Sequence, residues 1–100
     1  MRFEYDEAKR ARLLRERGVD ILVAARILNC DPLTRTDTRR HYGEERYVSV
    51  GMSAGELYVV VHTKRGDATR LITAWRGGRR LHEIYQAYLA GKAGGAEPKG

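Results

Sequence analysis

One histidine and several arginines fall at strand-like spacing, where they could act together on a phosphate. His62 and Lys64 lie two residues apart, so a strand places both on one face. Arg46 belongs to the expected strand before them, and Arg70 and Arg76 share a face of the strand after them, about 20 Å apart. An imidazole transfers protons near neutral pH, and guanidinium groups stabilise negative charge on a phosphate. The combination indicates cleavage of RNA without a metal.

Each candidate also has a plain structural interpretation. On spacing alone, His62 fits a half-buried strand residue that is satisfied by one hydrogen bond. Lys9 either faces the same groove from the first helix or pairs with Asp6. Trp75 alternates with apolar positions, so we expect it in the core rather than stacked on a base. His41 and His82 are weaker candidates for this chemistry. We expect Cys30 to be a structural residue.

The positive charge of the chain is concentrated in one segment. The 19 Lys and Arg residues outnumber the 13 Asp and Glu residues, which gives a net charge of +6. Residues 46–82 carry +5 of this excess, with only Glu56 and Asp67 as anions. Their cations are Arg46, Lys64, Arg65, Arg70, Arg76, Arg79 and Arg80. Such concentration favours a polyanionic partner, although basic side chains that simply line solvent-facing strand positions would explain it too.

Composition and motifs exclude several classes of protein. The longest apolar run is too short to cross a bilayer, and the charged first residues do not resemble a signal peptide. A single cysteine, Cys30, allows neither an internal disulfide nor a cysteine zinc site. The sequence contains no Gly-rich phosphate loop and no metal-ligand spacing. We therefore expect a cytoplasmic protein that needs no metal or cofactor and binds no membrane.

Three helices are expected, over residues 7–17, 21–28 and 79–90. Asp6 and Asp20 can cap the first two, and Gly18 can end the first. The apolar residues expected to face the core are Ala8, Ala11 and Leu14 in the first helix, Ile21, Ala24, Ala25 and Leu28 in the second, and Leu81, Ile84, Tyr85, Tyr88 and Leu89 in the last.

Between the second and third helices the hydrophobic period changes to 2, which is typical of strands. Three consecutive antiparallel strands are expected over 46–52, 57–64 and 69–76, with a weaker edge strand over 34–42. The fold class is therefore α+β, with N-terminal helices, a three- to four-stranded antiparallel sheet and a C-terminal helix. We expect one domain over 1–90 and a disordered tail over 91–100.

Short motifs in a fixed order carry a family resemblance over residues 3–85. They are Phe3-Glu4-Tyr5-Asp6-Glu7-Ala8-Lys9, Arg17-Gly18-Val19, Ala24-Ala25-Arg26, Asp31-Pro32-Leu33, Tyr42-Gly43-Glu44-Glu45-Arg46, Gly51, Val59-Val60-Val61-His62-Thr63-Lys64-Arg65-Gly66 and Arg70-Leu71-Ile72-Thr73-Ala74. In this order and spacing the chain resembles the BrnT toxins of type II toxin–antitoxin modules.

The resemblance implies a RelE-like fold and an endoribonuclease that inhibits translation by cleaving RNA, free or on the ribosome. It also implies a BrnA-like ribbon-helix-helix antitoxin. The chain itself would contact DNA only through this antitoxin. Under this hypothesis Lys9, Arg46 and Arg70 bind phosphate and stabilise the transition state, and His62 transfers a proton. The cations expected to contact RNA beside this site are Lys64, Arg65, Arg76, Arg79 and Arg80.

Two other hypotheses remain open, because the chain departs from the family pattern where basic or acid–base groups are usual. The departures are at Leu13, Glu16, Arg17, Trp75 and Leu81. One alternative is a catalytically degenerate homologue that binds RNA or an antitoxin without cleaving RNA. The other is a small structural subunit whose basic face meets an acidic protein surface.

Overall fold

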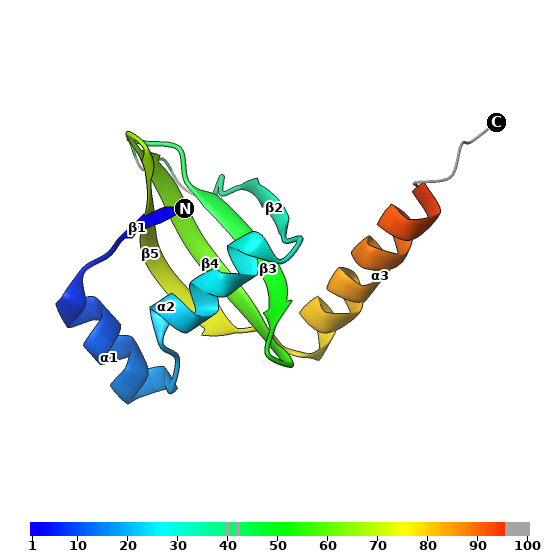
Figure 1. The fold of residues 1–100 in the computed structure, drawn as a ribbon, viewed down its shortest axis with the longest axis horizontal. Helices are drawn as coiled ribbons and strands as arrows, with labels where there is room; N and C mark the ends of the chain where they lie inside the picture. The colour runs from blue at the N-terminus through cyan, green and yellow to red at the C-terminus, as the bar shows by residue number, and fades with distance from the viewer. Residues whose placement is uncertain (40, 42, 96–100) are drawn as a thin grey trace.

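A five-stranded sheet forms the centre of the structure (Figure 1), a computed structural model that describes residues 1–39, 41 and 43–95. The strands are β1 (Arg2–Glu4), β2 (Leu33–Thr36), β3 (Tyr47–Ser53), β4 (Glu56–Arg65) and β5 (Ala68–Arg76), in the spatial order β1-β5-β4-β3-β2. The helices are α1 (Glu7–Arg17), α2 (Ile21–Ala24), its 3-10 continuation η1 (Ala25–Asn29), and α3 (Arg79–Gly95). The predicted α+β class is confirmed.

Helices pack on both faces of the sheet. α1, α2 and η1 lie against the face that carries Tyr58, Val60 and His62 of β4, which we call the helix face. α3 packs at the edge of the opposite face, which carries Leu57 and Val59 and which we call the α3 face. Each face has its own cluster of buried apolar side chains, so the core is split by the sheet.

The sheet is mixed, so the prediction of a purely antiparallel sheet of three or four strands is wrong. β1 pairs in parallel with β5, with Phe3 opposite Thr69 and Glu4 opposite Arg70. Three residues are too few to show an alternating pattern, and the partner strand lies at the other end of the chain. The meander β3–β4–β5 is antiparallel as predicted, and β2 forms an edge strand overlapping the predicted 34–42.

The helix bounds follow the predicted caps closely. Asp6 accepts hydrogen bonds from two N–H groups of α1, and Gly18 ends that helix at a φ of 66°. Asp20 caps α2 as predicted, but the expected helix over 21–28 becomes a 3-10 helix after its first turn. The predicted disordered tail is helical up to Gly95, and its remaining residues, 96–100, lie outside the described part of the chain.

α1 contacts the sheet through a face that differs from the predicted one. Leu13 is buried, whereas Leu14 is 51% exposed and Ala8 and Ala11 face solvent. The predicted apolar stripe is therefore wrong. A polar clamp replaces it, since Arg10 donates two hydrogen bonds of 2.9 Å to the carboxylate that caps α2.

β5 contains one more residue than the segment of β4 that pairs with it. Val61 pairs with Thr73 and His62 pairs with Leu71, so Ile72 is the extra residue of a β-bulge. Because side chains alternate along a strand, one inserted residue exchanges the faces of all residues beyond it.

A two-residue turn joins β3 to β4. Ala54 and Gly55 both have left-handed backbones, with φ of 52° and 81°, as a type I′ hairpin requires. This turn fixes the register that places Tyr47 opposite His62. An alanine Cβ crowds the backbone in this conformation, so Ala54 is a strained position.

Replacing Ala54 by Asn should raise the free energy of unfolding by about 0.5–1 kcal/mol, because Asn tolerates the left-handed region better than Ala. Urea unfolding followed by circular dichroism measures the change. Gly55→Ala, at the other left-handed position, should lower the same free energy by about 1 kcal/mol. An A54N variant that is no more stable than the parent would contradict the strain at this turn.

Candidate functional site

His62 ends a short hydrogen-bonded chain on the helix face. Its Nε2 lies 2.8 Å from the Oγ of Ser49 on β3, and that Oγ lies 2.6 Å from the Oγ1 of Thr34 on β2. The ring of Tyr47 lies beside the imidazole, with 5.8 Å between the ring centroids. Burial lowers the pKa of His62 below its ordinary value of 6.5. At neutral pH the imidazole is therefore uncharged, which is the form that accepts a proton.

The chain of hydroxyls allows His62 to change its charge without losing a hydrogen bond. In the neutral tautomer with its proton on Nε2, this nitrogen donates to Ser49 and Ser49 to Thr34, and Nδ1 is the nitrogen that can accept a proton. When the imidazole is protonated, Nε2 donates to Ser49 and Ser49 to Thr34. Ser49 is fully buried and Thr34 is exposed, so water can meet the outer end of the chain. This arrangement suits a group that takes up and releases a proton.

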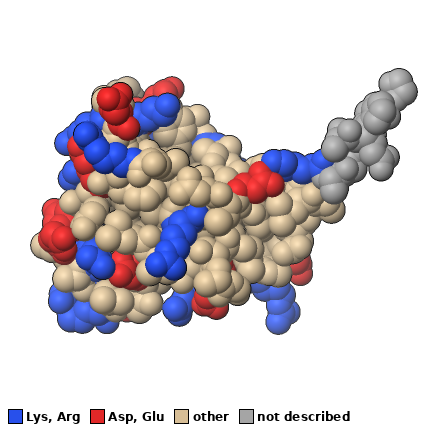
Figure 2. Space-filling view, in the orientation of Figure 1, with Lys and Arg blue, Asp and Glu red and all other residues tan. Residues whose placement is uncertain are grey.

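Lys9 on α1 lies in the positive field of three arginines. The pKa of Lys9 is lowered from 10.5 by burial first, and then by the positive charges of Arg12, Arg46 and Arg17, against an opposing effect of Asp6. An ammonium group in such surroundings lies in a positive potential, which a bound phosphate would relieve. Figure 2 shows basic side chains, interleaved with acidic ones, on the left of the molecule, where α1 lies in Figure 1.

Contacts within the protein hold two of these cations in place. The Nε of Arg46 lies 3.2 Å from a carboxylate oxygen of Glu44. The Nη1 of Arg17 donates a hydrogen bond of 3.0 Å to the carbonyl of Ala74 on β5. Side chains that are already ordered lose less entropy when an anion binds. Arg17 and Arg46 are therefore more ordered than freely solvated side chains would be.

Arg46 connects the cations around Lys9 to the strand that pairs with His62. Arg46 immediately precedes Tyr47, and Tyr47 pairs with His62 across β3 and β4. The positive charge of Arg46 contributes to the lowered pKa of Lys9. We call this set the Lys9–His62 site, and its members are Lys9, Arg46, Tyr47, Ser49 and His62. Three of the four residues that the sequence predicts as catalytic belong to this candidate set.

The fourth predicted catalytic residue, Arg70, lies on the other side of the sheet. It pairs with Thr63 on the α3 face, and its Nη1 lies 4.0 Å from the carboxylate of Glu4. Arg76 pairs with Tyr58 and belongs to the helix face. The predicted shared face of Arg70 and Arg76 is therefore wrong, because the extra residue in β5 lies between them.

The other predicted RNA contacts are spread over the molecule. The exposed ones are Lys64 and Arg65 at the end of β4, Arg76 at the end of β5, and Arg79 and Arg80 at the start of α3. Lys64 lies on the helix face with His62, whereas Arg65 points to the opposite face because side chains alternate. These cations therefore do not form one track along the helix face.

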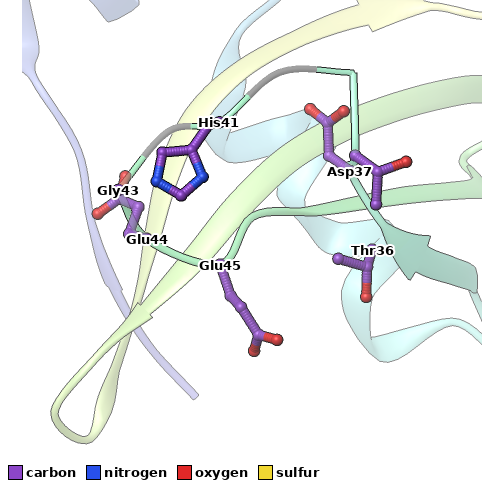
Figure 3. A pocket seen from close by; sticks show the side chains of 7 residues that line it. Thr36, Asp37, His41, Gly43, Glu44 and Glu45 are labelled. Carbon is purple, nitrogen blue, oxygen red and sulfur yellow. The ribbon is translucent and has the colours of Figure 1, made fainter.

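His41 lines a separate cavity of about 440 Å³ between the end of β2 and the start of β3 (Figure 3). The other lining residues are Thr36, Asp37, Thr38, Gly43, Glu44 and Glu45. Asp37 is buried and accepts two hydrogen bonds of 2.8 Å from the guanidinium of Arg39. A lining this rich in carboxylates repels phosphate, which makes His41 a weaker candidate than His62.

Two residues expected in the core occupy it on the α3 face. Trp75 is half-buried there, and Tyr85 is buried and donates a hydrogen bond of 2.9 Å to the carbonyl of Asp31. The thiol of Cys30 is exposed, so only the backbone of this residue takes part in the packing, through its carbonyl. These positions contribute structure and not chemistry to the Lys9–His62 site.

Sequence reasoning missed the residues that surround the imidazole, Thr34, Tyr47 and Ser49. A signal for the last two is present in the sequence, because the two-residue turn at Ala54–Gly55 fixes which residues of β3 face β4. Counting back from this turn pairs Tyr47 with His62. Thr34 has no such signal, since β2 and β3 are joined by a longer connection.

The described residues include no cluster of three or more His, Cys, Asp and Glu side chains that could hold a metal ion. In the same part of the chain, none of the helices is both long and apolar enough to cross a membrane.

A comparison with protein families identifies the family of this chain. The family model of the ribonuclease toxin BrnT of type II toxin–antitoxin systems matches residues 5–80. The chain belongs to the BrnT toxin family. The match includes Lys9, Arg46 and His62, and it implies that this BrnT-family chain has an antitoxin partner. No curated protein matches the chain significantly.

The lowered pKa of His62 should make the stability of this BrnT-family protein depend on pH. The unfolded chain takes up a proton near pH 6.5, whereas the folded protein does so only at lower pH. The free energy of unfolding should therefore be at its full value above about pH 6.5 and fall as the pH decreases below it. Urea unfolding at a series of pH values measures this decline.

His62→Gln removes the titrating group and should make the decline shallower. His82→Gln is the matched control, because His82 is exposed on α3. If the two variants lost stability with decreasing pH to the same extent, burial of the imidazole would not be the cause.

Proposed function

We propose that this chain is a metal-independent endoribonuclease toxin that acts at the Lys9–His62 site. The observation that carries the proposal is a half-buried, neutral imidazole held by Ser49. The cations around Lys9 and Arg46, which precedes the partner strand of His62, support it. These groups can supply a proton acceptor, a proton donor and fixed positive charge. The BrnT family is described as a ribonuclease toxin family, which agrees with this chemistry.

The proposed reaction is a transfer of the phosphoryl group within the RNA chain. His62 accepts the proton of a 2′-hydroxyl, and the 2′-oxygen forms a bond to the adjacent phosphorus. Arg46 and Lys9 stabilise the negative charge of the pentacovalent phosphorane. The bond from phosphorus to the 5′-oxygen then breaks, and Lys9 gives its proton to that oxygen. The products are a 2′,3′-cyclic phosphate and a 5′-hydroxyl.

We expect this cleavage to take place in the cytoplasm, on free or ribosome-associated RNA. Its effect in the cell would be to inhibit translation. The antitoxin that neutralises it is proposed to be a BrnA-like ribbon-helix-helix protein, which would also make the only contact with DNA. The RelE-like relationship of the fold belongs to the same proposal. It is supported by the order of two N-terminal helices, an antiparallel meander and a C-terminal helix.

A second candidate function is binding of RNA without cleavage. Leu13, Trp75 and Leu81 stand where the family resemblance leads us to expect polar groups, and all three pack into the apolar clusters. Arg17, another departure, is committed to a backbone carbonyl. The hydrogen bond of His62 to Ser49 is also what a purely structural histidine would make. These observations favour a chain that keeps its cations and has lost its catalytic groups.

Lys9→Ala, Arg46→Ala and His62→Ala should each lower the rate of RNA cleavage by about 100-fold or more, because each removes a group proposed to act on the phosphate. Arg70→Ala should lower it by less than about tenfold, since Arg70 lies on the opposite face. End-labelled RNA resolved on gels measures the rate. Growth after induced expression without antitoxin is the cellular readout.

The same assay separates the two candidate functions. RNA affinity that falls steeply with salt, with no cleavage by the parent protein, would support the binding module and overturn the enzyme. A loss of activity in Arg70→Ala as large as that in His62→Ala would show that the active site is not the Lys9–His62 site.

The rate of cleavage should depend on pH as a bell-shaped curve. It should rise as His62 loses its proton, at a pKa below 6.5, and fall as Lys9 loses its proton, at a pKa below 10.5. Measurements of kcat/KM across this range test both limbs. Lys9→Arg, whose guanidinium keeps its proton, should abolish the alkaline limb and retain the acid limb. An unchanged alkaline limb in this variant would exclude Lys9 as the acid.

A further inference from the structure

The α3 face of the sheet carries a groove that the proposed reaction does not use. Its volume is about 550 Å³, and it runs between β2 and the first turns of α3. Its floor and one wall are formed by the apolar residues Val48, Val50, Val59, Trp75, Leu81 and Ile84. The other wall is β2 with the residues that follow it, up to Arg39.

The apolar side chains of this groove are only partly covered by the protein itself. Val59 is buried at the bottom, but Val48, Trp75 and Leu81 are half-buried, and Ile84 on the rim is 44% exposed. The cause is the course of α3, which leaves the sheet and projects from the body of the molecule (Figure 1). Concave apolar surface of this kind is typical of a binding site for another molecule.

The charges around the groove are positive. Arg35 pairs with Val48 across β2 and β3, so it stands on the α3 face at the rim. Arg80 is exposed one helical turn before Ile84 and on the same side of α3. The single carboxylate among the lining residues, Asp37, is bonded to Arg39. Within the described residues, Arg35 and Arg80 have no ion-pair partner.

We infer that this groove binds an acidic, amphipathic segment of the antitoxin. Apolar side chains of the segment would cover Trp75 and Ile84, and its carboxylates would pair with Arg35 and Arg80. The inference rests on the antitoxin partner that the family implies and does not depend on the proposed cleavage. It places the partner on the face opposite to Lys9 and His62.

Other occupants fit the groove less well. A second copy of this chain carries the same net charge of +6 and would bring one positive rim against another. RNA could pair with the arginines, but the mainly apolar floor, Trp75 apart, offers its phosphates few donors. An acidic segment with an apolar face satisfies both the floor and the rim.

The test measures binding of the intact chain to its cognate antitoxin, purified after expression from the neighbouring reading frame. Ile84→Glu and Arg35→Glu should each weaken binding by about tenfold or more, because they place a carboxylate at an acidic interface. Leu14→Glu is the matched control for the first, since Leu14 is an exposed leucine, 51% exposed, on α1. Arg15→Glu, an exposed site on the same helix, is the control for the second. Both controls should bind within about twofold of the parent.

A second readout uses the single tryptophan of the chain, which lines the groove. The indole N–H signal of Trp75 in the intact protein should shift when the antitoxin is added and stay in place when a short RNA is added. This readout survives a failure of catalysis, because His62→Ala should bind the antitoxin like the parent.

Three results would overturn the inference. The first is unchanged antitoxin affinity in both Ile84→Glu and Arg35→Glu, with the Trp75 signal unmoved. The second is a loss of RNA affinity in these variants at unchanged antitoxin affinity, which would assign the groove to RNA. The third is a dimer of the parent chain that Ile84→Glu, and not Leu14→Glu, converts to a monomer, which would assign the groove to a second copy.

Discussion

The extra residue in β5 controls which charged side chains of the sheet can act together. Because Ile72 is inserted where β5 passes His62, the side chains of β5 exchange faces at that point. Arg76 stays on the helix face, and Arg70 is turned to the α3 face. A regular ladder continued from the other end of the strand would instead place Arg70 opposite Lys64, on the face of His62. The bulge thus removes Arg70 from the face that carries the imidazole.

The position of Lys9 depends in turn on how α1 is anchored. The helix meets the sheet through one buried leucine, Leu13, and through the clamp between Arg10 and Asp20. Lys9 is partly buried on this helix and lies in the positive field of three arginines. The weakly apolar character of α1 is therefore part of the chemistry proposed for the site.

The two faces of the sheet have different physical characters. The helix face holds a polar chain that is fully satisfied, and none of the buried side-chain nitrogen and oxygen atoms in the described residues lacks a hydrogen-bond partner. The α3 face is apolar and incompletely covered, because α3 turns away from it. Proton transfer benefits from the first environment, and docking of another protein benefits from the second. Under the two proposals, action on RNA and recognition by the antitoxin take place on opposite sides of one sheet.

The amino-acid sequence by itself determined the local features of this protein. The bounds of α1 follow from Asp6 and Gly18, and the meander follows from the alternation of its strands, because caps and pleats depend on near neighbours in the chain. The grouping of Lys9 with His62 stays a prediction from the sequence and the family resemblance. Only the tertiary structure decided the parallel pairing of β1, the bulge at Ile72 and the burial of Leu13 instead of Leu14. Each of these depends on contacts between segments far apart in the chain, and such contacts leave no trace in local spacing.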